Sequence, residues 1–378
     1  MPTQRARAMT MIAALTHLGV PLLIGDFLLT DNQRRPHTKL PGVTKTTQQI
    51  RANNERRAHG TSKKIHILHD RLALGFTGDL QRGKVLLTAI RDHFRTHSPA
   101  LHTLSKFLTT NARRHSDSEL LGWVAHNRRP LLFHWKERDP TTLLRPRTAF
   151  VGSGGIDFRD KHFSPLNEGP SAHANAVAQA RLFAVTKIGN IIERDILGDT
   201  NIAHAYGAGG EAIIWNGTKF EYVDSVGFNL FELIVNPGSD THQIAVGKVM
   251  TLYKSFGHYS AVQTIPVEDN PTTKKAEVKP GILDLRTSMF LEQPFPQGIP
   301  EHVLGPNPKY WQSTFMIRRQ NESAPGLTVV IAHEADGPEP IFAYDTANNI
   351  FTLRVEFLLK LAAEYEEHLK KARLDPSG

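Results

Sequence analysis

The sequence predicts an α+β fold in which two β-sheets pack face to face and helices cover the outer face of each sheet. Two observations predict it. Short apolar runs typical of strands come in pairs, and these pairs alternate with longer stretches in which apolar residues recur at helical spacing. The order is strands, two helices, strands, one or two helices, and strands again, which suits a sandwich of two sheets with helices outside.

The first half of this order lies before residue 113. Turn residues at His17-Leu18-Gly19 separate the first two apolar runs. Asp79 is placed to cap a helix whose apolar residues, among them Leu86 and Ile90, share one face. The predicted strands cover residues 11–15, 20–25, 64–68 and 71–76, and the predicted helices cover residues 80–96 and 100–112.

The second half of the order ends near residue 223. Residues 127–130 form the turn of one strand pair, and Asn216-Gly217 is a strong hairpin signal. A strand also runs into a glycine turn at Gly152-Ser153-Gly154-Gly155, for which we expect no strand-then-helix setting of the phosphate-loop kind. The predicted strands cover residues 123–125, 131–135, 148–152, 211–215 and 219–223, and a long helix covers residues 172–196.

Residues 236–378 have a different pattern, which predicts a β-rich extension that ends in a helix. Prolines are frequent between residues 265 and 308 and indicate loops. We expect strands over residues 315–319, 327–332 and 341–344, and an amphipathic helix over 351–373. The apolar residues of this helix that we expect to face a partner are Leu358, Leu359, Leu361 and Ala362. The predicted domains are residues 10–235 and 236–378, preceded by residues 1–9.

The net charge of +8 is concentrated in residues 31–64, which hold nine Lys or Arg and two acidic residues. The segment 31–62 has too few large apolar residues to fold alone, so we expect an insert that forms a loop or a hairpin. A charge run usually lies on a solvated face, and no aromatic residue here could stack on bases. We therefore do not expect nucleic-acid binding as the main function.

The composition excludes several classes of protein. Of the 378 residues, 40% are hydrophobic and 22% charged, and none is cysteine, which excludes disulfides and thiol catalysis. Arg5 and Arg7 before an apolar stretch imitate a signal peptide, but polar residues such as Asp26 interrupt the stretch and no small-x-small cleavage site follows. No long uninterrupted apolar run predicts a membrane span. We expect a cytoplasmic protein.

The polar residues that begin or follow the first strands could carry threonine chemistry. A threonine hydroxyl is a weak nucleophile and needs a nearby base. An N-terminal α-amine has a pKa near ~7.7–8 and could take the proton. A buried lysine would favour the neutral amine by like-charge repulsion, and a carboxylate would hold that lysine in place. Thr10, Lys64 and Asp26 supply these residue types.

In order and spacing, these residues resemble the N-terminal nucleophile hydrolases of the proteasome β type, and most closely the bacterial proteasome-like peptidase that pairs with an ATP-dependent unfoldase. The resemblance covers about residues 9–223 and implies a four-layer αββα sandwich. It rests on Gly75-Phe76-Thr77-Gly78, on Gly152-Ser153-Gly154-Gly155 and on an N-terminal motif that matches without a gap. The matching residues of that motif are Thr10, Ile12, Gly19, Gly25, Asp26 and Thr30.

The resemblance implies a role for each site residue. Thr10 would be the nucleophile, and Asp26 would orient Lys64. The Gly78 N–H would face the oxyanion, a contact typically worth ~3–4 kcal/mol in the transition state. Ser153 would hydrogen-bond the terminal amine.

Further roles follow from the same resemblance. Phe76 would shape the pocket for the residue before the cut, and Thr30 would bind the substrate backbone as an added strand. Asp199 would be a supporting carboxylate. No cofactor is required, but backbone carbonyls would bind a monovalent cation at Gly198, Asn201 and His204.

Two departures from the family are visible. Met11 replaces its usual second threonine, and the stretch between Asp26 and Lys64 is far longer, so the insert must loop out beside the cleft.

The expected function is that of a threonine-type endopeptidase or amidase acting on peptides or proteins through an acyl-enzyme ester. The resemblance also implies a ring-shaped homo-oligomer and an ATP-driven unfoldase as partner. Activity requires Thr10 to become the first residue, either because residues 1–9 are removed by self-cleavage or because Met9 is the true initiator. The alternative is a catalytically silent proteasome-like scaffold or binding protein that retains residues 1–9.

Overall fold

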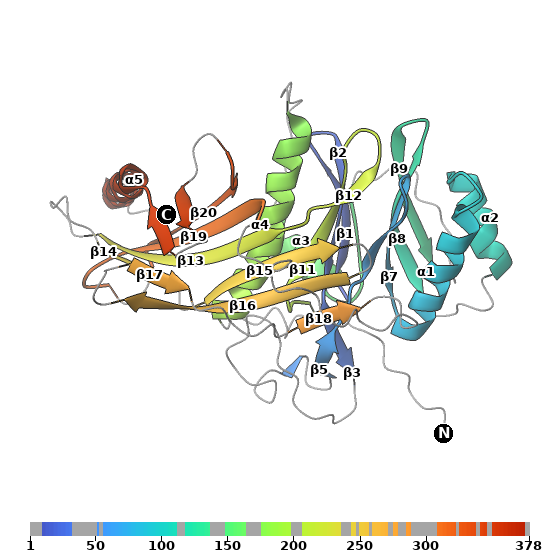
Figure 1. Ribbon diagram of the computed structural model, residues 1–378, viewed down its shortest axis with the longest axis horizontal. Coiled ribbons are helices and arrows are strands. Elements are labelled where there is room, and N and C mark those ends of the chain that lie inside the picture. Colours follow the sequence, from blue (N-terminus) through green and yellow to red (C-terminus); the bar gives the residue numbers. More distant parts are fainter. Residues whose placement is uncertain are drawn as a thin grey trace. The chain divides into compact units, whose positions relative to one another are not determined.

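The computed structural model shows a mixed α+β protein with mainly antiparallel sheets (Figure 1). It divides into two compact units. The first comprises Met1–Asp224, Lys254–Val262 and Asp284–Pro300, and the second Ser225–Tyr253, Gln263–Leu283 and Glu301–Gly378. The residues that the structure describes are 10–31, 51–52, 56–111, 118–136, 148–163, 175–197, 206–235, 243–246, 249–256, 259–270, 275–278, 285–288, 308–322, 325–337, 341–345 and 350–374.

The described part of the first unit contains two larger antiparallel sheets and one three-stranded sheet. The first of the larger sheets has the order β10-β1-β2-β11-β12, and the second has the order β6-β7-β8-β9. The strands of the first sheet are β1 (Ile12–His17), β2 (Val20–Asp26), β10 (Thr148–Val151), β11 (Gly210–Trp215) and β12 (Phe220–Tyr222). Those of the second are β6 (Ile65–His69), β7 (Leu72–Thr77), β8 (Glu119–His126) and β9 (Arg129–Lys136).

The two sheets pack face to face through alternate residues of their strands. Ile12 and Leu23 from one sheet meet Ala73 and Leu121 from the other in a single buried cluster. Alternation along a strand sends every second side chain to this interface. The indole of Trp123 also donates a hydrogen bond of 2.8 Å to the Leu22 carbonyl of the facing sheet.

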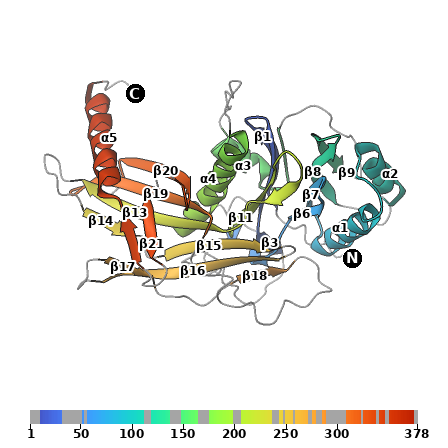
Figure 2. The ribbon, with the colours of Figure 1, turned by 45° about the horizontal axis from the view of Figure 1, so that its top comes forward.

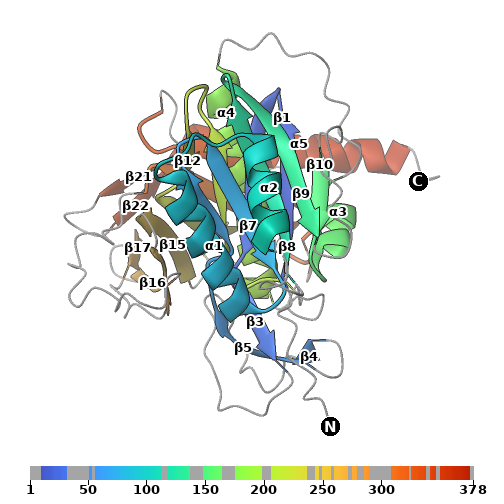
Figure 3. The same cartoon turned by 90° about the vertical axis from the view of Figure 1, so that its right-hand side faces the viewer.

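Helices cover the outer faces of both sheets. Helices α1 (Leu80–Phe94) and α2 (Leu101–Asn111) lie on the four-stranded sheet, and their apolar side chains share one buried cluster with those of β7, β8 and β9 (Figure 3). Helix α3 (Gly155–His162) packs beside β10, and α4 (Ala176–Leu197) packs on β1, β2 and β11. Residues 172–174 of the long predicted helix lie outside the described residues, and α4 begins at Ala176.

Local signals fixed several elements as predicted. Asp79 is the N-cap of α1, and its Oδ1 accepts a 2.9 Å hydrogen bond from the Arg82 N–H. At the β11–β12 hairpin Gly217 has a φ of 102°, a conformation that suits glycine. The Asn216 side-chain oxygen accepts hydrogen bonds from the backbone N–H groups of Thr218 and Lys219, which stabilise this turn.

The described ends of the insert pair with the strand that precedes it. Strand β3 (Leu28–Asp31) pairs with β5 (Arg56–Thr61), and β5 pairs with β4 (Arg51–Ala52), all antiparallel. An inserted hairpin was one of the two forms expected for this segment. It leads directly into Lys63 and Lys64.

The second unit is β-rich and ends in a helix. Strand β13 (Val226–Val235) pairs in parallel with β19 (Tyr310–Arg319) and antiparallel with β14 (Gln243–Val246). The unit therefore begins at Ser225 rather than at residue 236. The other described strands of this unit are β17 (Lys275–Val278), β20 (Leu327–Glu334), β21 (Phe342–Asp345) and β22 (Ile350–Leu353). Strands β15 (Val249–Phe256) and β16 (Tyr259–Asn270) are divided between the two units, and β18 (Leu285–Ser288) belongs to the first.

Helix α5 (Val355–Leu374) lies on the sheet of β13, β19 and β20 (Figure 2). Leu361 and Ala362 are each 2% exposed and pack on this sheet together with the partly buried Leu358, so in the described structure these residues face the sheet of their own chain. Leu359 is 41% exposed. The helix starts at Val355 rather than at residue 351, because residues 350–353 form a strand. None of the described helices is both long and apolar enough to span a membrane.

Candidate active site

Thr10 lies at the start of β1 and is 1% exposed. Its backbone N–H donates to Ser153 Oγ at 3.4 Å, and its carbonyl accepts a 3.2 Å hydrogen bond from the Gly154 N–H. Gly152 has a φ of 87°, and a Cβ atom there would lie 2.0 Å from the Thr10 carbonyl oxygen. The turn of residues 152–154 therefore holds the Thr10 backbone closely, and glycine at 152 is required for the approach.

This turn corrects one expectation from the sequence. It joins β10 directly to α3, so it does have a strand-then-helix setting. The Gly154 N–H is bonded to the Thr10 carbonyl. Within the described structure, this turn therefore holds the Thr10 backbone in place.

Asp26 ends β2 and is fully buried. Its Oδ1 accepts a hydrogen bond from the Met11 N–H at 2.9 Å, and its Oδ2 accepts from the N–H groups of Leu28 at 3.2 Å and Gly207 at 3.1 Å. The antiparallel pairing of β1 with β2 brings Asp26 beside Met11 and hence beside Thr10. Three backbone donors fix this carboxylate in one orientation.

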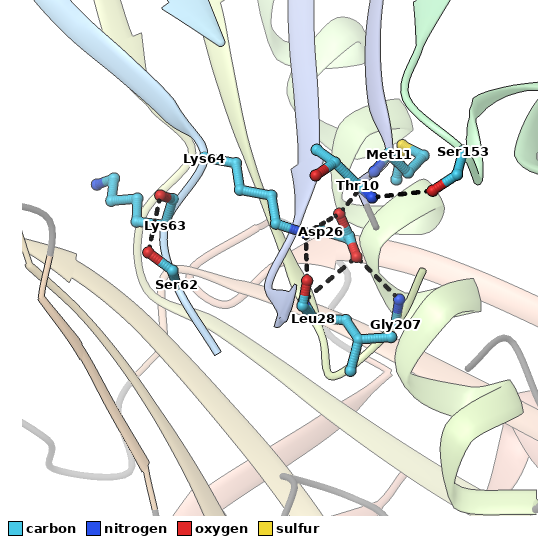
Figure 4. A network of polar contacts seen from close by, with 9 residues as sticks. All are labelled: Thr10, Met11, Asp26, Leu28, Ser62, Lys63, Lys64, Ser153 and Gly207. Atoms are coloured by element: carbon cyan, nitrogen blue, oxygen red, sulfur yellow. Dashed lines mark hydrogen bonds and ion pairs between the residues drawn. The ribbon is translucent and has the colours of Figure 1, made fainter. Parts of the chain in front are cut away.

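Lys64 comes from the segment before β6 and is 2% exposed. Its ammonium donates to Asp26 Oδ1 at 2.7 Å and to the Leu28 carbonyl at 2.5 Å. Figure 4 shows its side chain extending from its own strand toward Asp26, on the side to which the Thr10 side chain points. The sheet pairing therefore brings a lysine and a carboxylate to the start of β1.

Burial sets the electrostatics of this pair. It raises the pKa of the Asp26 carboxyl, while the Lys64 ammonium and the backbone N–H groups oppose that rise. Burial also lowers the pKa of the Lys64 ammonium, and Asp26 opposes that fall. The pair therefore places a lysine, together with its carboxylate partner, next to the backbone of Thr10 and Met11.

The structure thus brings together four of the predicted site residues: Thr10, Asp26, Lys64 and Ser153. They come from the start of β1, the end of β2, the segment before β6 and the turn after β10. Ser153 accepts a hydrogen bond from the Thr10 N–H. Asp26 accepts hydrogen bonds from the N–H of the next residue, Met11, and from the Lys64 ammonium. Gly78 directly follows β7 and has a φ of 109°.

Phe76, which was predicted to shape the pocket for the residue before the cut, is buried in the described structure, and this role stays a prediction. It is 2% exposed and belongs to the buried cluster between the four-stranded sheet and its helices. Its ring packs so closely on α1 that a Cβ atom at Gly83 would lie 2.1 Å from it. Along β7 it shares a face with Leu72 and Leu74, and that face is turned to the helices.

The other predicted residues are less informative. Thr30 lies in β3, where its backbone is opposite Ala58 of β5. Asp199 and the expected carbonyl donors Gly198, Asn201 and His204 lie outside the described residues. Among the residues that are described, no cluster of three or more His, Asp or Glu is arranged to hold a metal ion.

Sequence reasoning missed the loop of residues 207–209, which binds Asp26 through a backbone N–H group. Gly207, Ala208 and Gly209 all have positive φ values, and the Gly207 N–H bonds Asp26. The carbonyls of Gly207 and Gly209 in turn accept hydrogen bonds from the Phe27 N–H. The glycine-rich run at residues 207–210, just before β11, was the available signal.

Comparison of the sequence with protein-family models and with curated proteins gives no match.

Proposed function

We propose that this protein is a threonine-type N-terminal nucleophile hydrolase that cleaves peptide or other amide bonds. The observation that carries the proposal is the buried Lys64–Asp26 pair at 2.7 Å, held against the backbone N–H of the residue after Thr10. A scaffold gains little from such a pair, because burying two charges costs about as much as their attraction returns. The two packed sheets of the first unit, with helices on their outer faces, support the proposal of the αββα sandwich that the resemblance implies.

The chemistry follows from the groups in place. Thr10 Oγ1 attacks the substrate carbonyl while its proton passes to the Thr10 nitrogen. The protonated nitrogen then gives this proton to the leaving amine as the amide C–N bond breaks, which leaves the acyl group on Oγ1 as an ester. That nitrogen can accept a proton only as a free amine, so the Met9–Thr10 bond must first be broken. Ser153 Oγ, 3.4 Å away, is placed to orient the amine. Water then attacks the ester. The same amine takes the proton of the water and returns it to Oγ1 as the C–O bond breaks and the carboxylic acid leaves.

In this proposal Lys64 acts on the Thr10 amine through its charge, and Asp26 holds Lys64. The Lys64 ammonium disfavours protonation of the amine by like-charge repulsion and keeps it a base near neutral pH. Asp26 holds the ammonium in position through its own three backbone donors. The Gly78 N–H is the proposed oxyanion donor, and the ring assembly and unfoldase partner remain predictions from the resemblance.

The proposal is tested by steady-state hydrolysis of a fluorogenic peptide amide panel, with variants made in chains that begin at Thr10. Thr10→Ala should abolish turnover, and Thr10→Ser should retain it because a hydroxyl and an amine both remain. Lys64→Met should reduce kcat at least roughly 100-fold with KM little changed, as for loss of general-base assistance. Full activity of Thr10→Ala would overturn the proposal.

A second candidate is a catalytically silent scaffold that retains residues 1–9. It is favoured by the burial of Thr10, which is 1% exposed, and by the packing of Phe76 in the core. The two candidates differ in the chain's first residue. A purified protein that keeps residues 1–9 and hydrolyses no peptide would support the scaffold.

A further inference from the structure

A second buried ion pair lies next to the first along the chain. Lys63 Nζ is 3.1 Å from Glu211 Oε2, and both side chains are 0% exposed. The Lys63 ammonium also lies 3.6 Å from the ring centroid of Tyr222, a cation–π contact. The Tyr222 hydroxyl accepts a 3.2 Å hydrogen bond from the Ile67 N–H, which ties β12 to β6. Two consecutive lysines are therefore both buried and both paired.

The two carboxylates occupy neighbouring positions of adjacent strands. In the β2–β11 register Glu211 is opposite Gly25, and Gly210 is opposite Asp26. The lysine segment crosses this strand pair, with Lys64 bonded to β2 and Lys63 bonded to β11. Turning Lys64 away from Asp26 by rotating the segment would also break the Lys63–Glu211 pair.

Stability alone is a poor explanation for Lys63 and Glu211. Two charges removed from water lose solvation that their attraction roughly returns, and well-packed apolar residues of similar size often serve as well. What a buried pair does supply is a single allowed geometry. A one-residue slip would turn each lysine to the opposite face and bring Ser62 or Ile65 to a position that a lysine occupies, so one carboxylate would lose its partner.

We propose that Lys63 and Glu211, with Tyr222, form a positioning device that holds the neighbouring Lys64 on Asp26. Its importance for catalysis rests on the proposed function, but the geometric claim does not. Within the described part of the chain, the Glu211 carboxylate acts on both Lys63 and Tyr222. Burial lowers the pKa of the Lys63 ammonium, Glu211 opposes that fall, and burial and Glu211 together raise the pKa of the Tyr222 hydroxyl.

The geometric claim is tested by lysine acetylation footprinting, read by tandem mass spectrometry. Lys84 on α1 is 7% exposed and serves as an internal control for global unfolding. In Glu211→Gln, labelling of Lys64 should rise roughly tenfold or more while labelling of Lys84 stays at the wild-type level. The reason is that loss of the Glu211 charge frees Lys63, and the segment that carries both lysines can then turn. Lys63→Arg, which keeps the charge, should leave Lys64 protected.

A second variant separates the ion pair from simple packing. Lys63→Met combined with Glu211→Leu fills the space without charge. The proposal expects Lys64 to become labelled in this variant too, with Lys84 unchanged. Continued protection of Lys64 in both this variant and Glu211→Gln would overturn it.

Hydrolysis measured on the same proteins separates this inference from the proposed function. If the wild-type enzyme is active, Glu211→Gln should lower kcat roughly tenfold or more with KM within about twofold, the pattern of a lost transition-state contact. An active wild type with an unchanged kcat in Glu211→Gln would refute the catalytic importance of the device. If a wild-type chain beginning at Thr10 is inactive, the proposed function fails, and footprinting still decides the geometric claim.

Discussion

Asp26→Asn should destabilise the first unit strongly, because it leaves the buried Lys64 ammonium without a counter-charge. The carboxylate accepts hydrogen bonds from the N–H groups of Met11, Leu28 and Gly207 as well as from Lys64. An asparagine of the same shape keeps one accepting oxygen and presents an NH2 group where a second acceptor stood. One or more of the four donors therefore faces another donor.

The expected magnitude follows from the burial of both groups, which are 2% and 0% exposed. Breaking such a pair from one side costs about 3–5 kcal/mol, a large part of the ~5–15 kcal/mol that holds a typical domain together. Lys64→Met should cost less, about 1–3 kcal/mol, because the carboxylate keeps its three backbone donors. In the double variant the costs should fall short of their sum by about 2 kcal/mol.

The assay is urea unfolding followed by tryptophan fluorescence in a Trp311→Phe background. Trp123 and Trp215 pack between the two sheets of the first unit and report on it, whereas Trp311 belongs to the second unit. All four proteins of the cycle are measured at pH 7. Additive costs, with a coupling below about 0.5 kcal/mol, would refute the claim that the two side chains act as one buried pair.

Three further predictions concern the support of the site. Gly152→Ala should cost about 3 kcal/mol or more in the free energy of unfolding, since its Cβ would meet the Thr10 carbonyl oxygen at 2.0 Å, whereas Gly217→Ala has open space and should cost about 1 kcal/mol in the same urea titration. Burial, followed by the nearby cationic side chains, lowers the pKa of His162 to about 3, so only the unfolded chain takes up its proton as the pH falls below about 6.5. Stability should therefore be lost on acidification from pH 7 to pH 5 by about 2 kcal/mol more in wild type than in His162→Gln, and equal losses would contradict this. Asp79→Ala should cost about 1 kcal/mol through loss of the α1 N-cap, measured by thermal unfolding, and an unchanged stability would show that the cap is not needed.

Elements with local signals were predictable from the sequence. The cap at Asp79 and the hairpin turn at Asn216-Gly217 depend on residues that are neighbours in the chain, and both appear as predicted. Helix α3 had no such signal, because its N-cap Gly154 offers no side-chain oxygen. The boundary at Ser225 was also hidden, since β13 belongs to the second unit through parallel pairing with β19, a strand far along the chain.

In the candidate site too, some residues could be predicted from the sequence and others depend on distant strand pairing. Residue chemistry indicated what a threonine nucleophile needs, and the family resemblance selected Asp26, Lys64 and Ser153, which the structure joins to the start of β1. The orientation of Phe76 could have been read from the alternation in β7, which places it with the residues under α1. Glu211 gave no signal, because its pairing with a lysine depends on the register of distant strands.

The most direct test of the central claim is the intact mass of the purified protein after reaction with an electrophilic peptide inhibitor, with the modified residue located by peptide mapping. The account predicts a chain that begins at Thr10 and carries one inhibitor adduct on that residue. A chain that begins at Thr10 and stays unmodified, or one that retains residues 1–9 and carries no adduct, would contradict it.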